Sequence, residues 1–553
     1  MSNFKVWLTQ FIGDKPTLAS ISAGVLFGIS FPPFPFPFQL FALLGIAIWV
    51  EIIRNSRSAR NALTLLFYGL LPANLVISYW LMMATVGGGI AAVVAKAVVM
   101  ALMLLPFIVL IRAKSYTAST LQLLGLAAAW VFAEGIDLYW DLSYPWLWIG
   151  NAWAELPAFY QYISLTGILG LSAWVAFCAL VLHKWLFMET ERGSEELANW
   201  NNYASIAIIF LPLIGSIAYF NLVKEVEIEA VAEESKISTL LVQPNHDSYA
   251  EYGGFKSYAE ALEALITLTD SAITEQTEII YWPENALDPF IMNRQQNRYQ
   301  LKVQTAVNSW GIPLITGTTF REYYDVEKDS VPLVVRNRDS QNPVKLFNSA
   351  VAFKPEQKEP IIYKKMRLVP LVEKLPFEEF LVSTNFLGFD WEEWSLFGQG
   401  DSLEVYNLIE GKNALAPALI CYDSAYPELG FLAADQAFNY LAVITNDGWW
   451  GNSSGHIQHL ALSRLRAVES GKWLVRAANN GISGVISPRG ILSHETQYWT
   501  KTTISTTIPL VQGNTFFHRF GNWFFYLCCG GVGLSLGMSF LGKNIEWFLI
   551  RRL

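Results

Sequence analysis

Residues 415–423 read LAPALICYD, an apolar run with strand character that ends at Cys421 and leads directly into an acid. Similar runs recur between residues 236 and 512, and helical patterns separate several of them, as at residues 258–273 and 456–470. Strands that alternate with helices indicate a layered α/β domain. The expected strands cover residues 237–243, 278–282, 313–319, 349–353, 415–421, 441–445, 473–478 and 482–487.

Outside this domain the chain is far more apolar. Of its 553 residues, 53% are hydrophobic and 15% are charged, whereas about 25% of residues are charged in a soluble globular chain. Crossing a bilayer takes about 20 helical residues, and eight apolar segments approach or exceed that length. They cover residues 17–31, 37–54, 61–84, 88–112, 118–136, 161–186, 204–222 and 523–542. The sequence therefore predicts a polytopic membrane region of eight transmembrane helices in addition to the α/β domain.

The basic residues in the connecting loops indicate the orientation. Lys and Arg precede the first apolar segment and follow the second, fourth, sixth and eighth, whereas the alternate loops near residues 32–37, 85–88 and 137–160 contain none. Cytoplasmic loops carry an excess of Lys and Arg, so we expect both termini in the cytoplasm. The expected domains are a seven-helix region at 1–222, an extracytoplasmic α/β domain at 223–522, and a last helix with a cytoplasmic tail at 523–553.

Charge and cysteine usage argue against several kinds of site. The net charge of −9 leaves no basic stripe for a nucleic acid. Cys178, Cys528 and Cys529 fall in apolar segments, and no cysteine spacing indicates a disulfide framework or a zinc site. His456 and His459 are spaced as on one helix face, but no third ligand motif accompanies them. We therefore expect no metal.

Three places in the α/β domain carry residues suited to nucleophilic catalysis. Glu284 follows a predicted strand, Lys365 lies in the segment 363–370, and Cys421 ends another strand. An acid can take the thiol proton, and an ammonium group can stabilise both the thiolate and a later oxyanion. Each residue also has a structural explanation, since a cysteine can pack as a small hydrophobe, a glutamate can cap a helix and a lysine can be solvated. Spacing alone leaves these alternatives open.

In this order, the three sites resemble the Glu–Lys–Cys triad of the carbon–nitrogen hydrolase (nitrilase) superfamily. The whole chain resembles the membrane-embedded branch of that superfamily, the apolipoprotein N-acyltransferases. The densest match includes residues 445–451, 458–459, 464, 466, 469, 476–483 and 488–490, and residues 144–147 also match. The resemblance implies a nitrilase-like αββα sandwich for the α/β domain.

The resemblance also assigns roles to individual residues. It makes Glu284 the general base and Cys421 the nucleophile, with Lys365 and the backbone N–H of Tyr422 stabilising the oxyanion. Lys365 is chosen over its neighbour because the family has its lysine two residues after the tyrosine at 363. Glu373 matches a second essential acid. Tyr422 and Asp423 match an aromatic–acid pair that follows the nucleophile.

This chain departs from the family pattern at four positions near these residues. Arg367 stands where the family usually has His, and Val372 stands where it usually has Gly. Asp423 replaces the usual Glu, and Pro244 replaces a Gly. The three triad positions are intact, so we expect the chain to be active. The shorter side chain of Asp423 is expected to alter a contact near the nucleophile.

Residues 366–400 are rich in aromatic side chains with acids between them. One interpretation is a loop that packs on the domain core. The other is a lid that dips into the outer leaflet and guides acyl chains to Cys421, because exposed aromatic residues favour the membrane interface. The side chains expected to contact lipid in the second case are Phe377, Phe386, Trp391 and Trp394.

The resemblance implies a ping-pong acyl transfer that needs no cofactor, in a bacterial inner membrane with the catalytic domain on the periplasmic side. Cys421 would take the sn-1 acyl chain of a phospholipid, with phosphatidylethanolamine as the expected donor. The amine of a diacylglyceryl-cysteine lipoprotein would then accept the chain. A membrane-anchored amidase or nitrilase, in which water resolves the acyl-enzyme, is the alternative enzyme. A transporter or lipid scaffold with an inactive hydrolase domain is the alternative of another class, and the intact triad argues against it.

Overall fold

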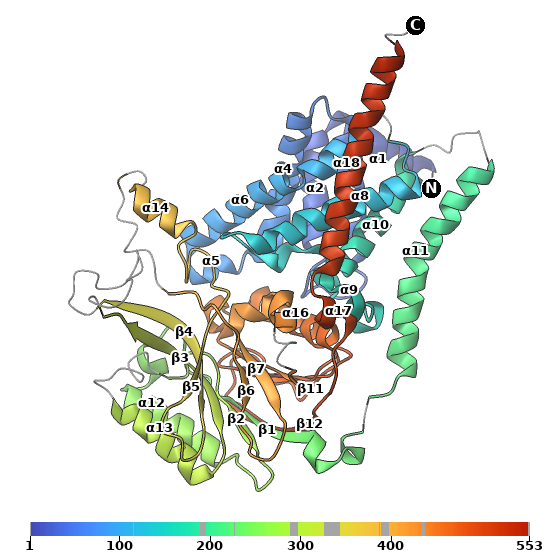
Figure 1. Ribbon diagram of the computed structural model, residues 1–553. Coiled ribbons are helices and arrows are strands. Elements are labelled where there is room, and N and C mark those ends of the chain that lie inside the picture. Colours follow the sequence, from blue (N-terminus) through green and yellow to red (C-terminus); the bar gives the residue numbers. More distant parts are fainter. Residues whose placement is uncertain are drawn as a thin grey trace. The chain divides into compact units, whose positions relative to one another are not determined.

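The computed structural model describes residues 2–113, 116–188, 195–225, 227–287, 297–325, 343–385, 388, 397–432 and 437–550 (Figure 1). The chain divides into two compact units. We call the first the membrane unit, which consists of Met1–Trp140, Tyr144–Val223 and Phe520–Leu553. We call the second the α/β unit, which consists of Asp141–Ser143 and Lys224–Arg519.

Several helices of the membrane unit are apolar on nearly every side, so they lack the polar face of a surface helix. The described residues of this unit form twelve α-helices. They are α1 (Ser2–Asp14), α2 (Pro16–Gly28), α3 (Leu40–Asn55), α4 (Ala59–Ser78), α5 (Leu81–Ala84), α6 (Val86–Met103), α7 (Leu105–Ile111), α8 (Thr120–Ile136), α9 (Ile163–Thr166), α10 (Ile168–Phe187), α11 (Glu195–Leu222) and α18 (Trp523–Ile550).

Five helical segments in the described part of the chain are long and apolar enough to cross a bilayer. They are Ala59–Ser78, Val86–Met103, Thr120–Tyr139, Ile168–Phe187 and Asn202–Leu222. Helix α2 and the apolar segment Trp523–Ser539 of α18 are shorter, and α3 has only 16 residues. A polytopic helical membrane region is therefore confirmed, while the count of eight spans stays a prediction.

The α/β unit contains two six-stranded sheets (Figure 1). The first has the order β12-β1-β2-β3-β4-β5 and the second the order β11-β10-β9-β8-β7-β6. The first sheet consists of β1 (Lys236–Gln243), β2 (Ile279–Tyr281), β3 (Leu314–Tyr323), β4 (Val344–Phe353), β5 (Ile361–Lys364) and β12 (Thr502–Pro509). The second consists of β6 (Val405–Asn407), β7 (Leu415–Ile420), β8 (Leu441–Thr445), β9 (Leu474–Ala478), β10 (Gly484–Ile486) and β11 (Leu492–Ser493).

The central strands of both sheets are parallel. In the first sheet β1, β2 and β3 run in the same direction, and in the second β7, β8 and β9 do so. These strands are buried along most of their length and are rich in Ile, Leu, Val and Ala, as expected for parallel strands covered on both faces. Parallel strands place their carboxyl ends at one edge, which is where ligand crevices form in α/β sheets.

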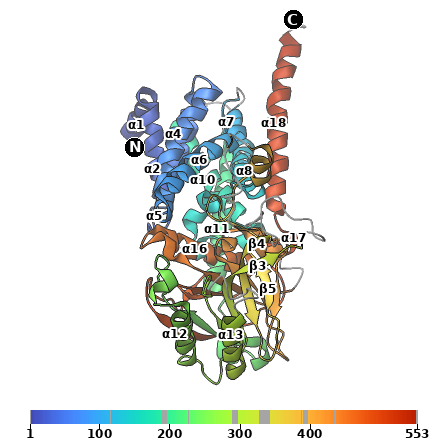
Figure 2. The ribbon, with the colours of Figure 1, turned by 90° about the vertical axis from the view of Figure 1, so that its left-hand side faces the viewer.

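Helices cover the outer faces of the two sheets. Helices α12 (Tyr258–Asp270) and α13 (Asn297–Trp310) pack against the first sheet in both views (Figure 1 and Figure 2). Their buried residues, Leu262, Leu265, Val303 and Val307 among them, form one apolar core with Leu240, Ile280 and Trp282. Helix α16 (Ser454–Ser470) packs against the second sheet.

The inner faces of the sheets are in contact with each other. Tyr281 of β2 and Tyr440, next to β8, share a hydrogen bond of 2.8 Å between their hydroxyls, and Tyr406 of β6 donates to the carbonyl of Ala350 in β4 at 3.0 Å. The predicted αββα sandwich is therefore confirmed. Shorter helices in this unit are α14 (Glu378–Thr384), α15 (Pro427–Leu432) and α17 (Phe516–Phe520), and the 3-10 helices include η10 (Cys421–Ala425) and η12 (Asp447–Trp450).

Candidate active site

Three strand ends bring the predicted triad into one buried region of the α/β unit. Glu284 lies just beyond β2, Lys365 follows β5 directly, and Cys421 follows β7 directly. Their exposed fractions are 5%, 1% and 8%. The Lys365 Nζ lies 3.5 Å from Glu284 Oε1 and 2.9 Å from Glu373 Oε1. One ammonium group therefore lies between two carboxylates, and the structure brings the predicted supporting acid Glu373 into the same cluster.

Asn348 links the two carboxylates from the other side. Its Nδ2 donates to Glu284 Oε1 at 2.8 Å and to Glu373 Oε1 at 2.9 Å. The second oxygen of each acid accepts from the backbone, Glu284 Oε2 from Asn446 N at 2.9 Å and Glu373 Oε2 from Val369 N at 2.8 Å. Hydrogen bonds to the charged form hold a buried carboxylate in place. Both acids are thus fixed in orientation before any substrate arrives.

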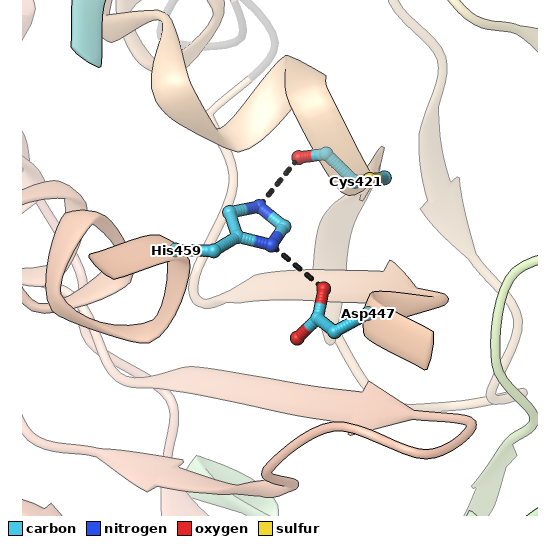
Figure 3. Close-up of side chains that lie close together, drawn as sticks. All are labelled: Cys421, Asp447 and His459. Atoms are coloured by element: carbon cyan, nitrogen blue, oxygen red, sulfur yellow. Dashed lines mark hydrogen bonds and ion pairs between the residues drawn. The ribbon is translucent and has the colours of Figure 1, made fainter. Parts of the chain in front are cut away.

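Cys421 occupies a sharp turn between β7 and η10. Its φ of +47° lies in the left-handed region, which costs a residue with a Cβ on the order of 1 kcal/mol or more. The surrounding bonds hold this conformation, because Ser424 Oγ donates to the Cys421 carbonyl at 2.7 Å and His459 Nε2 donates to it at 3.1 Å. Figure 3 shows that the ring of His459 faces this carbonyl oxygen rather than the sulfur.

A fully buried charged network supports that histidine. His459 Nδ1 lies 2.9 Å from Asp447 Oδ1, and Arg476 Nη2 lies 2.7 Å from Asp447 Oδ2 (Figure 3 shows the first contact). Thr445 Oγ1 also donates to Asp447 Oδ1, at 2.8 Å. Burial alone would raise the pKa of Asp447, but Arg476 and His459 lower it well below its usual value. Asp447 is therefore a carboxylate, and its charge orients the ring beneath Cys421.

The same residues have the spacing of metal ligands. The candidate ligand atoms of Cys421, Asp447 and His459 lie within 4.8 Å of one another. Both oxygens of Asp447 already bond to protein groups, and Arg476 neutralises its charge. A divalent cation would have to displace these partners. The expectation of no metal stays a prediction, and the donor set fits a structural network better than an open metal site.

The charges around Cys421 set its resting state. Burial raises the pKa of the Cys421 thiol well above its usual value, and Glu284 adds to this rise, whereas Lys365 and a hydrogen bond with Thr445 oppose it. Burial would lower the pKa of Lys365, but Glu373 and Glu284 outweigh burial and raise it. The resting site therefore holds a neutral thiol beside an ammonium ion. Attack by sulfur needs a base that removes the proton as the bond forms.

Asp423 connects this turn to the segment that carries the lysine. It accepts from Tyr363 Oη at 2.8 Å, from Arg367 N at 2.8 Å and from Ile420 N at 3.2 Å. Burial raises the pKa of Asp423 to about 6, although Lys365 opposes the rise. The shorter acid at this position is thus fully bonded.

The other departures from the family pattern have different surroundings. The Arg367 guanidinium pairs with Glu428 at 2.8 Å and lies 5.1 Å from the ring centroid of Tyr426. Val372 is 45% exposed, so a side chain fits there without crowding the site. Tyr422, which matches the family pattern, is buried, and its hydroxyl donates to the carbonyl of Ser143 at 2.9 Å.

Three of the four side chains that are predicted to contact lipid from the lid fall outside the described residues. That is the case for Phe386, Trp391 and Trp394. Phe377 is described, has a φ of +56° at the start of α14, and is 46% exposed. Phe380, one turn into the helix, is 55% exposed. An apolar surface exists where the predicted lid begins, and its contact with lipid stays a prediction.

Sequence reasoning missed Asn348, which is the central hydrogen-bond donor of the cluster. The predicted strand begins at residue 349, one residue after Asn348. Its partners are 64 and 25 residues away along the chain. A buried amide at that point gives no local signal, because only the fold shows which carboxylates it meets.

Comparisons with known proteins cover both units. A family model for carbon–nitrogen hydrolases matches residues 241–515, and a model for the N-terminal domain of apolipoprotein N-acyltransferases matches residues 23–181. An apolipoprotein N-acyltransferase of Chlorobaculum tepidum is 28% identical over 536 residues, which is 94% of this chain and 96% of that relative. A second, from Geobacter metallireducens, is 26% identical over 551 residues, with 97% of each chain covered.

Solved structures similar to the chain include Saccharomyces cerevisiae Nit3, a member of branch 10 of the nitrilase superfamily. It is 18% identical, covers 51% of this chain and 93% of its own, and has a TM-score of 0.35. The N-terminal-domain model matches a stretch within the first part of the chain, and the carbon–nitrogen hydrolase model matches a stretch within the α/β unit. The two relatives match nearly the full length of the chain. The chain belongs to the apolipoprotein N-acyltransferase family, the membrane branch of the carbon–nitrogen hydrolase superfamily.

Proposed function

We propose that this protein transfers an acyl chain from a phospholipid, through a thioester on Cys421, to the N-terminal amine of a diacylglyceryl-cysteine lipoprotein. The relatives that match nearly its full length are named apolipoprotein N-acyltransferases. The observation that carries the proposal is the buried cluster in which Lys365 lies between Glu284 and Glu373, next to a neutral cysteine thiol. This cluster has a nucleophile, a base and a cation for the oxyanion.

In the first half-reaction Cys421 attacks the sn-1 ester of the phospholipid, with phosphatidylethanolamine as the proposed donor. Glu284 takes the thiol proton as the new C–S bond forms. The Lys365 ammonium and the backbone N–H of Tyr422 stabilise the negative oxygen of the tetrahedral intermediate. The C–O bond then breaks, Glu284 returns the proton to the leaving alkoxide, and a lysophospholipid departs.

In the second half-reaction the lipoprotein amine attacks the thioester carbon. A C–N bond forms, the C–S bond breaks, and the amine proton passes through Glu284 to the cysteine sulfur. The product is an amide, and the free thiol is restored. Atoms and charges balance in both steps without a cofactor.

We further propose a bacterial inner-membrane location with the α/β unit on the periplasmic side and both termini in the cytoplasm. Support comes from the distribution of Lys and Arg, which are absent from the loops near residues 32–37, 85–88 and 137–160. Donor and acceptor lipids would both lie in the outer leaflet on that side. The exposed Phe377 and Phe380 are proposed to contact lipid there.

The test uses the purified full chain with a phospholipid labelled in its sn-1 acyl chain. We expect a hydroxylamine-labile label on Cys421, and its transfer to the amine of a synthetic diacylated lipopeptide. Cys421→Ala should abolish the label, whereas Cys529→Ala, a control at a partly buried cysteine of α18, should retain it. A wild-type protein that never forms the adduct would refute the proposal. Release of the label only as free fatty acid would support the alternative, a membrane-anchored hydrolase.

A further inference from the structure

Three residues that lie between membrane helices in the sequence belong to the α/β unit. Asp141–Ser143 is grouped with that unit, while Trp140 and Tyr144 on either side belong to the membrane unit. The ends of this loop are fixed, because Asp137 accepts from Tyr144 N at 3.1 Å and from Trp140 Nε1 at 3.0 Å.

Asp141 uses both carboxylate oxygens on one segment of the α/β unit. Lys374 Nζ donates to its Oδ1 at 2.9 Å, and the backbone N–H of Phe377 donates to its Oδ2 at 2.8 Å. Burial would raise the pKa of Asp141, but the bonds from Lys374 and Phe377 lower it. Asp141 is thus an anion that holds residues 374–377 at two points.

This segment carries the acid that bonds the catalytic lysine. Glu373 immediately precedes Lys374, and its Oε1 accepts from Lys365 Nζ at 2.9 Å. Residues 369–374 form a tight turn. The Val369 carbonyl accepts a hydrogen bond from the N–H of Glu373, and the Lys374 carbonyl accepts one from the N–H of Leu371, both at 2.8 Å. A displacement of Lys374 therefore moves Glu373 with it.

Ser143 contacts the other side of the site. Its carbonyl accepts from Tyr422 Oη at 2.9 Å and from Tyr426 Oη at 3.2 Å, and its Oγ accepts from Tyr426 Oη at 2.9 Å. Tyr422 follows Cys421 directly, so residues 141–143 contact both the segment of Glu373 and the turn of the nucleophile. All three residues of these contacts are buried.

We propose that Asp141 is a positioning residue for acyl transfer, which fixes Lys374 and Phe377 and thereby holds Glu373 against Lys365. The inference rests on the proposed function. Partly exposed ion pairs contribute little to stability, and the Asp141 and Lys374 side chains are 34% and 21% exposed. The contact therefore matters for the geometry of the site more than for the stability of the fold. Misplacement of catalytic groups by about 1 Å can slow a reaction on the order of 100-fold.

The experiment compares full-length Asp141→Ala, Lys374→Ala and the double variant, with Glu263→Ala as a control that breaks the exposed Lys302–Glu263 pair. The rate of Cys421 acylation by labelled phospholipid is measured across donor concentrations. We expect Asp141→Ala to lower the maximal rate roughly tenfold or more at nearly unchanged half-saturation. The double variant should be no slower than Asp141→Ala alone, because both residues act through one contact. Glu263→Ala should match wild type.

A second readout is the pH profile of Cys421 alkylation by iodoacetamide, which needs no lipid. If Glu373 moves away, Lys365 stabilises the thiolate more strongly, and the midpoint of the profile should shift to lower pH in Asp141→Ala. If Asp141→Ala acylates at the wild-type rate and its alkylation profile is unshifted, the inference is overturned. It is also overturned if the fold-reductions in rate of the two single variants multiply in the double variant. A rise in half-saturation alone would assign Asp141 to lipid entry and also overturn it. If the wild-type protein forms no thioester but Asp141→Ala still shifts the alkylation profile, the proposed function is refuted and the positioning role of Asp141 stands.

Discussion

Replacement of Asn348 by Leu tests the hydrogen-bonded core of the site. Leu has a similar volume and no polar atoms, so it removes the donor without opening a cavity. Asn348 Oδ1 is buried and has no hydrogen-bond partner among the described residues, so the substitution removes no other side-chain bond. What is lost is the pair of bonds from Nδ2 to Glu284 and Glu373, at 2.8 and 2.9 Å.

The size of the effect follows from these two bonds. A hydrogen bond to a charged group contributes about 1.5–3 kcal/mol, and the two bonds share Lys365 as a neighbour, so their effects will not add fully. We take about 3 kcal/mol as the loss, which corresponds to a rate reduction of roughly 100-fold. Without Nδ2 the Lys365 ammonium is the one side-chain donor that the two buried carboxylates still share among the described residues. Glu284, the proposed base, would then be held less firmly in orientation.

The assay is the single-turnover rate at which labelled phospholipid acylates Cys421 at saturating donor, together with a thermal melting curve. Asn308→Leu is the control, since Asn308 is an exposed residue of α13 that bonds Gln304 and the backbone of Glu356. We expect the control to match wild type. A folded Asn348→Leu protein that acylates within about threefold of wild type, a difference of under 1 kcal/mol, would refute the assignment of Asn348 to the site.

Three further predictions concern the surroundings of the triad. A Cβ on Gly317 would lie 2.5 Å from Glu284 Cα, so Gly317→Ala should slow acylation by roughly tenfold or more, whereas Gly215→Ala, where the Cβ meets open space, should not. Arg476→Met leaves Asp447 buried without its cation and should destabilise the fold by about 3–5 kcal/mol in denaturant unfolding. The control Lys302→Ala breaks an exposed ion pair and should cost below about 1 kcal/mol. A loss as small as that in Arg476→Met would contradict the prediction. The raised pKa of Asp423, about 6 against an ordinary 3.8, means that the folded protein binds this proton more tightly than the unfolded chain. The stability that Asp423 contributes is therefore present below pH 3.8 and is lost as the pH rises through about 6. The difference in melting temperature between wild type and Asp423→Asn should change over the same pH range. A difference that stays constant with pH would contradict this prediction.

Two of the three strands that precede the triad residues, β2 and β7, could be predicted because they are short, apolar and buried, and β8 could be predicted for the same reason. Strand β5, which precedes Lys365, lies outside the predicted strands, because it has four residues and only Tyr363 among them is buried. Strand β12 was not predicted. It reads TTISTTIP, has four threonines and one serine that are at most half-buried, and pairs with β1 at the sheet edge. Polar edge strands of this kind resemble loops in composition.

Residues that act through distant partners could not be found from the sequence. Asn348 and Asp141 have no local motif, and their partners lie far along the chain. Asp447, His459 and Arg476 lay within the segment that resembles the family, but the sequence did not show that they form one buried network under the Cys421 carbonyl. The order of three sites that resembles a known family led to Glu284, Lys365 and Cys421, which the structure brings into one buried region, and their catalytic roles stay a prediction.

The most direct measurement follows one acyl group from Cys421 to its acceptor. The full chain is acylated with labelled phospholipid, freed of donor, and mixed with a diacylated lipopeptide, and the label on the Cys421 peptide and on the lipopeptide is measured over time by mass spectrometry. The proposed mechanism predicts that label leaves Cys421 at the rate at which an amide forms on the lipopeptide, and that Cys421→Ala shows neither signal. Transfer of label to the lipopeptide without a Cys421 adduct would contradict the proposal. Transfer of label to the lipopeptide by Cys421→Ala would contradict it as well.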